Sequence, residues 1–234
     1  MLRVRKSGDR GRTRFDWLDS RHTFSFGDYY DRDHMGFGPL RVINEDFVAP
    51  ETGFGMHPHR DMEILTYVLS GSLRHWDTLG NGSILRAGDV QRMSAGTGIL
   101  HSEENPSREK ETHFLQIWIL PERRGIAPEY EQATLDPRRR RGRLQRIAGP
   151  KNGDGSLVLH RDVELFASLM ARGQGVEHGL RAGRQAWIQV ARGSVNVNGV
   201  PLEAGDGAGA TNESVLALEG TGAGEADILV FDLP

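Results

Sequence analysis

The chain contains no cysteine. This absence excludes disulfide bonds, thiolate metal sites and cysteine nucleophiles, and it fits a reducing cytosol. A metal could therefore be held only by nitrogen and oxygen atoms. The chain also lacks the run of about 18 apolar residues that a membrane span needs, and its basic N-terminus has no apolar segment behind it. We therefore predict a soluble, unprocessed, cytoplasmic protein.

The chain also has no large excess of positive or negative charge. The 29 basic and 32 acidic residues give a net charge of −3, so there is no broad basic surface and nucleic-acid binding is disfavoured. The exception is PRRRRGRL at 137–144, whose arginines could clasp phosphates. Because no aromatic residues interleave with these arginines, we interpret the run as a solvated linker.

Sustained helical periodicity is scarce, whereas short strand-like segments are frequent. These segments are rich in β-branched and aromatic residues and end at Gly, Asn or Asp turns. They cover 40–48, 63–71, 72–78, 112–120, 156–160, 186–193, 194–199 and 227–233. The segment 162–170 fits either a short helix or a strand. With thirty glycines to supply turns, this pattern predicts an all-β fold.

An internal repeat indicates two domains. Residues 66–98 parallel 188–214 as strand, Gly, strand, turn, short strand, AGD and strand, with Gly71 matching Gly193 and Gly88-Asp89 matching Gly205-Asp206. Such a repeat is typical of two small barrels built from one unit. The polar segment between them, with its Gly and Pro residues, is expected to be a linker. The predicted boundaries are 1–133 for the N-terminal domain, 134–155 for the linker and 156–234 for the C-terminal domain.

Two short stretches carry candidate metal ligands. MHPHRDMEIL at 56–65 places polar side chains at every second position, which in a strand is one face: His57, His59, Asp61 and Glu63. Alone, this pattern could equally be a solvated surface loop. MSAGTGILHSEENP at 93–106 adds a second pair two residues apart, His101 and Glu103. Together the pairs indicate a metal site, although strand parity leaves either Glu63 or Glu103 as its carboxylate.

These motifs resemble the pirin branch of the cupin superfamily. GFGMHPHRDMEILTYVLSG is similar to the first cupin motif, GDVQRMSAGTGILHSEEN to the second, and residues 17–46 to the segment that precedes them in pirins. The resemblance implies two jelly-roll-like cupin barrels, a bicupin, with metal in the N-terminal barrel. The implied ligands are His57, His59, His101 and Glu103. A general cupin would use Glu63 instead.

Under this resemblance Glu63 becomes a supporting carboxylate that satisfies the core or orients a ligand histidine. Asp61 and Glu104 are expected to be solvated. The C-terminal half has no HxH pair and no later histidine at the matching place, so its barrel is expected not to hold the same metal.

The resemblance also implies a chemistry. One divalent metal is expected per chain, with iron as the expected ion and Mn, Ni, Cu or Zn also suited to this ligand set. The implied activity is that of a quercetin 2,3-dioxygenase, which opens a flavonol ring with O2 and releases carbon monoxide. Our hypothesis gives Glu103 a second role, taking the proton of the flavonol 3-hydroxyl.

The alternative function is a non-catalytic, iron-sensing regulatory protein that acts through protein partners, since one fold permits both. We expect a monomer with no nucleic-acid or membrane partner.

The remaining histidines and aromatic residues are expected to be structural. His22 could approach the metal pocket, but the favoured expectation is that it packs or hydrogen-bonds at the domain seam. His113 is expected to face the core or an edge. The aromatic side chains Phe24, Phe26, Phe37 and Trp118 are expected in the core, where any of them could wall an aromatic pocket. No ligand-spaced partner is expected for His34, His75, His160 or His178.

Overall fold

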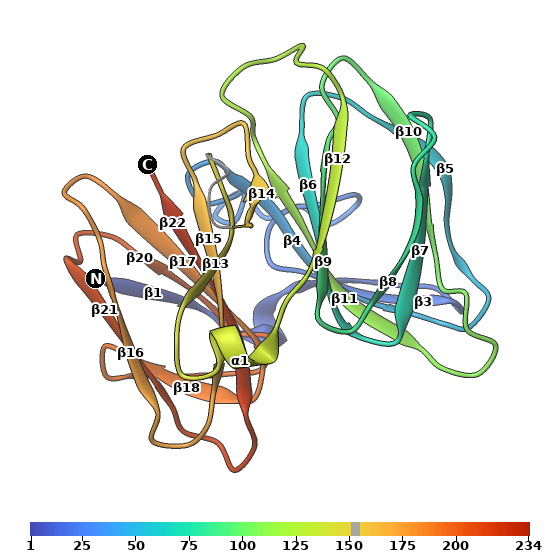
Figure 1. The fold of residues 1–234 in the computed structure, drawn as a ribbon. Helices are drawn as coiled ribbons and strands as arrows, with labels where there is room; N and C mark the ends of the chain where they lie inside the picture. The colour runs from blue at the N-terminus through green and yellow to red at the C-terminus, as the bar shows by residue number, and fades with distance from the viewer. Residues whose placement is uncertain (151–154) are drawn as a thin grey trace. The chain divides into compact units, whose positions relative to one another are not determined.

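The computed structural model describes residues 1–150 and 155–234 (Figure 1). The all-β prediction is confirmed, because the described residues contain strands and only two short helical pieces, α1 (Pro137–Arg140) and a 3-10 turn at Ser7–Asp9. No helix in this described part is long and apolar enough to cross a bilayer. The chain divides into two compact units, named here the N-terminal barrel (Gly11–Leu135 and Leu157–Arg161) and the C-terminal barrel (Met1–Arg10, Asp136–Ser156 and Asp162–Pro234).

The N-terminal barrel consists of two antiparallel sheets. One has the strand order β12-β9-β6-β11-β4-β3-β2 and the other β5-β10-β7-β8. The strands are β2 (Gly11–Arg14), β3 (Leu18–His22), β4 (Leu40–Val48), β5 (Gly53–His59), β6 (Glu63–Ser70), β7 (Ser72–Asp77), β8 (Gly82–Arg86), β9 (Asp89–Ser94), β10 (Ile99–Glu104), β11 (Thr112–Ile119), β12 (Glu129–Thr134) and the short β14 (Leu157–Val158).

The C-terminal barrel repeats this plan. Its larger sheet runs β1-β20-β17-β22-β15-β13 within the unit, and its smaller sheet runs β16-β21-β18-β19. The strands are β1 (Leu2–Arg5), β13 (Gln145–Gly149), β15 (Glu164–Met170), β16 (Gly175–Gly179), β17 (Gln185–Arg192), β18 (Ser194–Val197), β19 (Val200–Glu203), β20 (Gly207–Ala210), β21 (Val215–Gly220) and β22 (Ala226–Leu233). The segment that fitted a helix or a strand, 162–170, is the strand β15.

The units differ from the predicted boundaries in three places. The first residues belong to the C-terminal barrel because β1 pairs with β20, Leu2 opposite Ala210. Part of the predicted linker is structured, since it contains α1 and also β13, which pairs with β15. Residues 157–161 join the N-terminal barrel, where the Val158 amide donates to Glu131 at 2.7 Å. Linker residues 151–154 lie outside the described residues.

The arginine run at 138–143 is exposed except for Arg140, as expected of a solvated segment, but three of its arginines also form ion pairs. Asp136 caps α1 by accepting from the backbone N–H of Arg138, and it also pairs with the Arg138 guanidinium at 2.9 Å. Arg140 is buried against Asp227 at 3.0 Å. Arg141 lies 2.5 Å from Glu225. Only the pair between Arg140 and Asp227 is buried in the C-terminal barrel, because the other two pairs lie on the surface, where ion pairs add little stability.

The matched turns of the repeat adopt the same backbone conformation. Gly71 and Gly193 have φ of 76° and 72°, and Gly88 and Gly205 have 88° and 84°. These values lie in the left-handed region that favours glycine. The amide of Gly88 donates to Val68 at 2.9 Å, and that of Gly205 donates to Val190 at 2.8 Å. The sequence repeat is thus a structural repeat.

The interior of the N-terminal barrel has a polar layer between two apolar clusters. One cluster contains Leu18, Val48, Val68, Leu73, Leu85 and Phe114, and the other Ile64, Met93, Ala95 and Ile99. On β6, Thr66 lies between Val68 and Ile64, two residues from each, so it projects into the space between the clusters. The candidate site occupies this layer.

Candidate metal centre

Strand β10 brings the candidate ligands together. Its His101 lies opposite His57 of β5 on one side, and its Glu103 lies opposite His75 of β7 on the other. A bulge between His101 and Glu103 interrupts the pairing with β5. Bulges bend a strand and re-aim its side chains, and they are frequent next to functional sites. The two motifs seen in the sequence therefore meet through cross-strand register.

Three imidazoles converge at this place. The ring centroids of His57, His59 and His101 are 4.4 to 4.8 Å apart. One ligand nitrogen from each ring lies within 4.8 Å of the others, close enough to hold a metal ion. This convergence agrees with the expected histidine ligands.

The electrostatics keep two of these imidazoles neutral. Burial, with repulsion from His101 and His57, lowers the pKa of His59 to about 4. Burial, with repulsion from His57 and His75, lowers the pKa of His101 to about 3. At neutral pH both rings carry a free lone pair, which is the form that binds a metal.

Unsatisfied atoms provide a test of whether a metal fits. His101 is 1% exposed, and neither of its ring nitrogens has a hydrogen-bond partner among the described residues. A buried polar atom without a partner is unusual and calls for a ligand or an ion. His57 uses Nδ1 to donate to the Gly55 carbonyl at 2.7 Å, which leaves Nε2 as its lone-pair nitrogen. The donor set fits a divalent transition metal.

Glu103 lies at the inner side of the centre. Gln116 Nε2 donates to Oε2 at 2.6 Å, while Thr66 Oγ1 and Gln91 Nε2 donate to Oε1 at 2.9 and 3.0 Å. These three donors fix the orientation of the buried carboxylate. Glu103 groups with His101 and His75 within 4.8 Å, but not with His57 and His59 at that limit.

His75 was not expected at the site, and that prediction was wrong. It is fully buried, its Nε2 lies 3.0 Å from Asp77 Oδ2, and its Nδ1 has no partner in the described part of the chain. Its place beside Glu103 comes from the pairing of β7 with β10. The alternation of His75 and Asp77 along a predicted strand was the signal available in the sequence.

The other acidic candidates lie away from the imidazoles. Glu63 is buried and accepts from Ser94 at 2.9 Å, so it satisfies the core and does not orient a ligand histidine. Burial raises its pKa, against the opposing hydrogen bond from Ser94. Asp61 accepts from the Gly125 amide at 2.6 Å, and the exposed Glu104 lies 3.7 Å from Arg74.

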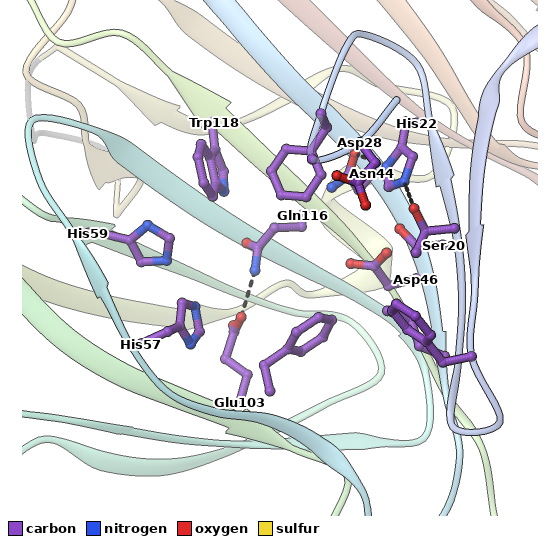
Figure 2. Close-up of a pocket in the computed structure, with 16 residues that line it drawn as sticks. Ser20, His22, Asp28, Asn44, Asp46, His57, His59, Glu103, Gln116 and Trp118 are labelled. Atoms are coloured by element: carbon purple, nitrogen blue, oxygen red, sulfur yellow. Dashed lines mark hydrogen bonds between the residues drawn. The ribbon is translucent and has the colours of Figure 1, made fainter. Parts of the chain in front are cut away.

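A cavity of about 270 Å³ opens beside the centre (Figure 2). His57, His59 and Glu103 line it, with Trp118 and Phe26 among its aromatic walls. The Trp118 ring is perpendicular to that of His59, with centroids 4.9 Å apart. Trp118 and Phe26 thus wall the pocket. Phe24 is a buried core residue.

His22 also lines this cavity, which agrees with the alternative that it approaches the metal pocket. Its ring nitrogens lie 2.8 Å from Thr13 Oγ1 and 2.8 Å from Asn44 Oδ1. The remaining histidines pair with carboxylates within 3.1 Å. These pairs are His34 with Asp31, His113 with Glu45, His160 with Glu129 and His178 with Asp232.

Comparison with known proteins decides the family. The pirin family model matches residues 3–119, and the model of the quercetinase C-terminal cupin domain matches residues 146–233. A quercetin 2,3-dioxygenase of Escherichia coli strain K12 is 45% identical over 234 residues, covering 100% of this chain and 99% of the relative. The chain belongs to the pirin family. The predicted bicupin fold of this family is confirmed as well.

Solved structures agree with this assignment. The crystal structure of the bacterial pirin YhhW from E. coli in complex with nickel(II) is 45% identical, has a TM-score of 0.94 and covers 100% of this chain and 99% of that one. The structure of YhaK from E. coli is 28% identical with a TM-score of 0.75, covering 96% and 94%. The comparisons confirm a quercetin-dioxygenase-like oxidoreductase, and the histidine cluster supports a divalent metal cofactor. The four individual ligands remain a prediction.

Proposed function

We propose that this pirin is a metal-dependent dioxygenase that opens the flavonol ring of quercetin-like substrates with O2 and releases carbon monoxide. The observation that carries the proposal is a cluster of three imidazoles, with His101 buried, beside an aromatic-walled cavity that His57, His59 and the carboxylate of Glu103 line. Curated relatives that are 44 to 45% identical are named as quercetin 2,3-dioxygenases. We infer that iron is the native metal, and that the protein acts as a cytoplasmic monomer.

The residues of this chain that would hold the metal are His57, His59, His101 and Glu103. A divalent metal bound there supplies Lewis-acid and redox chemistry that makes a flavonol reactive toward O2. His57 presents Nε2 because Gly55 fixes its Nδ1 proton. His59 and His101 stay neutral because burial, together with repulsion from neighbouring imidazoles, lowers their pKa values.

Glu103 is proposed to act on the substrate as well as on the metal. Its carboxylate lines the cavity, where a flavonol 3-hydroxyl could reach it. Gln116, Gln91 and Thr66 hold the carboxylate in place, so that it need not reorganise when it takes the hydroxyl proton. The walls formed by Trp118 and Phe26 are expected to exclude water and to align a flat ring system.

The test compares two buried carboxylates in iron-loaded protein. With quercetin in air, we expect O2 consumption and carbon monoxide release for many turnovers per metal ion. Glu103→Ala should lower turnover by at least about 100-fold, because it removes both a ligand and a proton acceptor. Glu63→Gln, which alters a carboxylate hydrogen-bonded to Ser94 instead, should keep turnover within about twofold of the unsubstituted protein.

Two results would count against the proposal. Glu103→Ala protein with full metal content and full turnover would remove Glu103 from the reaction. Quercetin binding without any O2 consumption, whichever of the five metals is supplied, would favour the regulatory alternative that acts through protein partners.

A further inference from the structure

The cavity carries a second polar group on the side away from the imidazoles. Figure 2 shows His57 and His59 on one side and Ser20, Asn44 and Asp46 on the other, with Gln116 and Glu103 between them. None of these three distant residues takes part in the proposed metal centre. A ligand that fills the cavity from the metal outward would meet them with its far end.

Asp46 is the unusual member of this group. It lies on β4 opposite Ser20 of β3, and only 3% of its surface is exposed. One carboxylate oxygen, Oδ1, has no hydrogen-bond partner among the described residues. A buried carboxylate oxygen without a donor is costly, and such groups are usually satisfied by a partner or a ligand. The Oδ1 atom of Asp46 is therefore a hydrogen-bond acceptor that a ligand donor could satisfy.

The surroundings do not supply a permanent cation for this carboxylate. The cavity lining within the described residues contains neither lysine nor arginine. Burial raises the pKa of Asp46 to about 7, with Glu103 and Glu45 adding repulsion and the Ser20 hydroxyl opposing it through a hydrogen bond. The neighbouring His22 does not pair with Asp46 through these nitrogens, because its two ring nitrogens hydrogen-bond to Thr13 and Asn44. The second of these bonds holds Asn44 in place.

The walls between the two polar ends suit a flat aromatic ligand. Phe15, Phe26, Phe54 and Trp118 line the cavity, and the Phe26 and Trp118 rings meet edge to face at 5.3 Å. Aromatic walls stack well on aromatic ligands, and a few fixed polar groups set the ligand's orientation. A hydroxyl on the outer ring of such a ligand is a donor of the kind that Asp46 lacks.

We propose that Asp46 accepts a hydrogen bond from a phenolic hydroxyl at the end of the substrate remote from the metal, so that the enzyme selects polyhydroxylated flavonols. Asp46 is thus a specificity-determining residue, and the Ser20 hydroxyl orients it. This inference rests on the proposed function and narrows its substrate class.

The experiment uses two flavonols that share the metal-binding 3-hydroxy-4-keto group. Quercetin carries further hydroxyls, whereas 3-hydroxyflavone carries none. Dissociation constants are measured without O2 on nickel-loaded protein by ligand absorbance, and turnover is measured in air on iron-loaded protein. Asp46→Leu should weaken quercetin binding by about 10- to 100-fold, the cost of losing a hydrogen bond to a charged group. It should leave 3-hydroxyflavone within about twofold.

Two further variants separate recognition from folding. Asp46→Asn keeps an acceptor oxygen at the site and should retain part of the preference for quercetin. Glu45→Gln changes the adjacent residue on the same strand, whose carboxylate bonds His113 and does not line the cavity, and it should leave the preference unchanged. Metal content and thermal unfolding of each variant establish that the barrel is intact.

The outcomes distinguish this inference from the proposed function. An unchanged ratio of quercetin to 3-hydroxyflavone affinity in both Asp46 variants would overturn the role of Asp46, even if O2 is consumed. Binding of both flavonols without O2 consumption would overturn the enzymatic proposal, while the affinity ratio still tests Asp46. Failure of the unsubstituted protein to bind either flavonol would overturn both.

Discussion

The two barrels share a framework and differ in what fills it. Gly88 and Gly205 make the same left-handed turn, and Asp89 and Asp206 each accept a backbone amide from three residues earlier. Yet the interior of the N-terminal barrel has a polar layer with three imidazoles, whereas the matching interior of the C-terminal barrel, in the described residues, is packed by an aliphatic cluster. The turns and strand order therefore do not depend on the site.

Counting from the matched glycines, and from the strand register, aligns the two interiors position by position. Thr66 corresponds to Ile188, His75 to Val197 and Gln91 to Ala208, and the pairings of β10 and β21 place His101 with Leu216 and Glu103 with Leu218. On the outer strands, His57 corresponds to His178 and His59 to Leu180. Of these seven polar positions of the N-terminal barrel, six are thus aliphatic in the C-terminal barrel.

This difference shows how a barrel acquires a metal centre. The polar side chains occupy every second position of several strands, and apolar residues two positions away keep the two clusters of the core. The C-terminal barrel has one histidine at a matching position, His178, but a single histidine does not make a metal centre. His178 hydrogen-bonds to Asp232 at 2.8 Å, and the residue opposite it across the strand pair is Leu216.

The largest effect is expected from placing a carboxylate at the position of the C-terminal barrel that matches Glu103. Leu218→Glu puts an ionisable group into the aliphatic cluster without donors, and it should lower the free energy of unfolding by about 3–5 kcal/mol. Urea unfolding followed by fluorescence and circular dichroism measures this loss. Leu218→Met should cost less than about 1.5 kcal/mol. Equal stability of the two variants would mean that the C-terminal interior tolerates polar groups.

The matched histidines provide the next test. His57→Ala should reduce nickel affinity by more than about 100-fold, the upper range for loss of a group that merely supports a ligand. His178→Ala should leave metal content unchanged, because no metal-binding group in the described residues includes it. Metal analysis after dialysis measures both. Metal loss in His178→Ala, or full retention in His57→Ala, would contradict the difference between the barrels.

The matched glycines should differ by a smaller amount. Gly88→Ala costs only the left-handed conformation, about 1–2 kcal/mol, because the added carbon would make just an ordinary contact, 4.0 Å from the Leu135 carbonyl oxygen. Gly205→Ala has the same strain and would also collide with the side chains of Ser7 and Arg10. We expect a lower melting temperature for Gly205→Ala than for Gly88→Ala. Equal values would show that the side chains around Gly205 move aside freely.

The smallest effect concerns pH. The folded state lowers the pKa of His101 to about 3, from an ordinary value of 6.5. As pH falls below 6.5, the His101 imidazole becomes protonated in the unfolded chain but stays neutral in the folded state. The metal-free protein therefore loses stability, by at most about 1.4 kcal/mol per pH unit. His101→Leu, which installs the residue found at the matching position, Leu216, removes this term. The free energy of unfolding of this variant, relative to that of the unsubstituted metal-free protein, should therefore increase as pH falls from 7.5 to 5.5. Urea unfolding measures this difference, and a difference that does not change with pH would contradict the lowered pKa of His101.

Much of the fold was predictable because its signals are local. Alternation and turn glycines fixed the positions of strands such as β4, β6 and β22 to within about one residue, and the AGD repeat disclosed two barrels. The boundaries were not predictable from composition. β1 lies in the C-terminal barrel through its pairing with β20, which is a long-range contact that no local pattern announces.

The site was predictable to the same extent. Alternation within one strand marked the pairs His57 and His59, and His101 and Glu103, as candidates. The choice of Glu103 over Glu63 came from the resemblance to pirins, and the structure brings the three histidines together. His75, Asp46 and the donors around Glu103 were missed, since their neighbours are set by cross-strand register. Gln116 meets Glu103 at 2.6 Å, although no motif links them. Spacing reveals ligands on one strand but not the residues that support them from another.

The most direct test of the central claim is an anomalous-scattering crystal structure of this protein loaded with nickel(II). We predict one ion per chain, within about 2 Å of nitrogens from His57, His59 and His101 and of a Glu103 oxygen, with the C-terminal barrel empty. An ion held by His75 in place of His57 and His59, an ion at His178, or no ion at all would contradict the account.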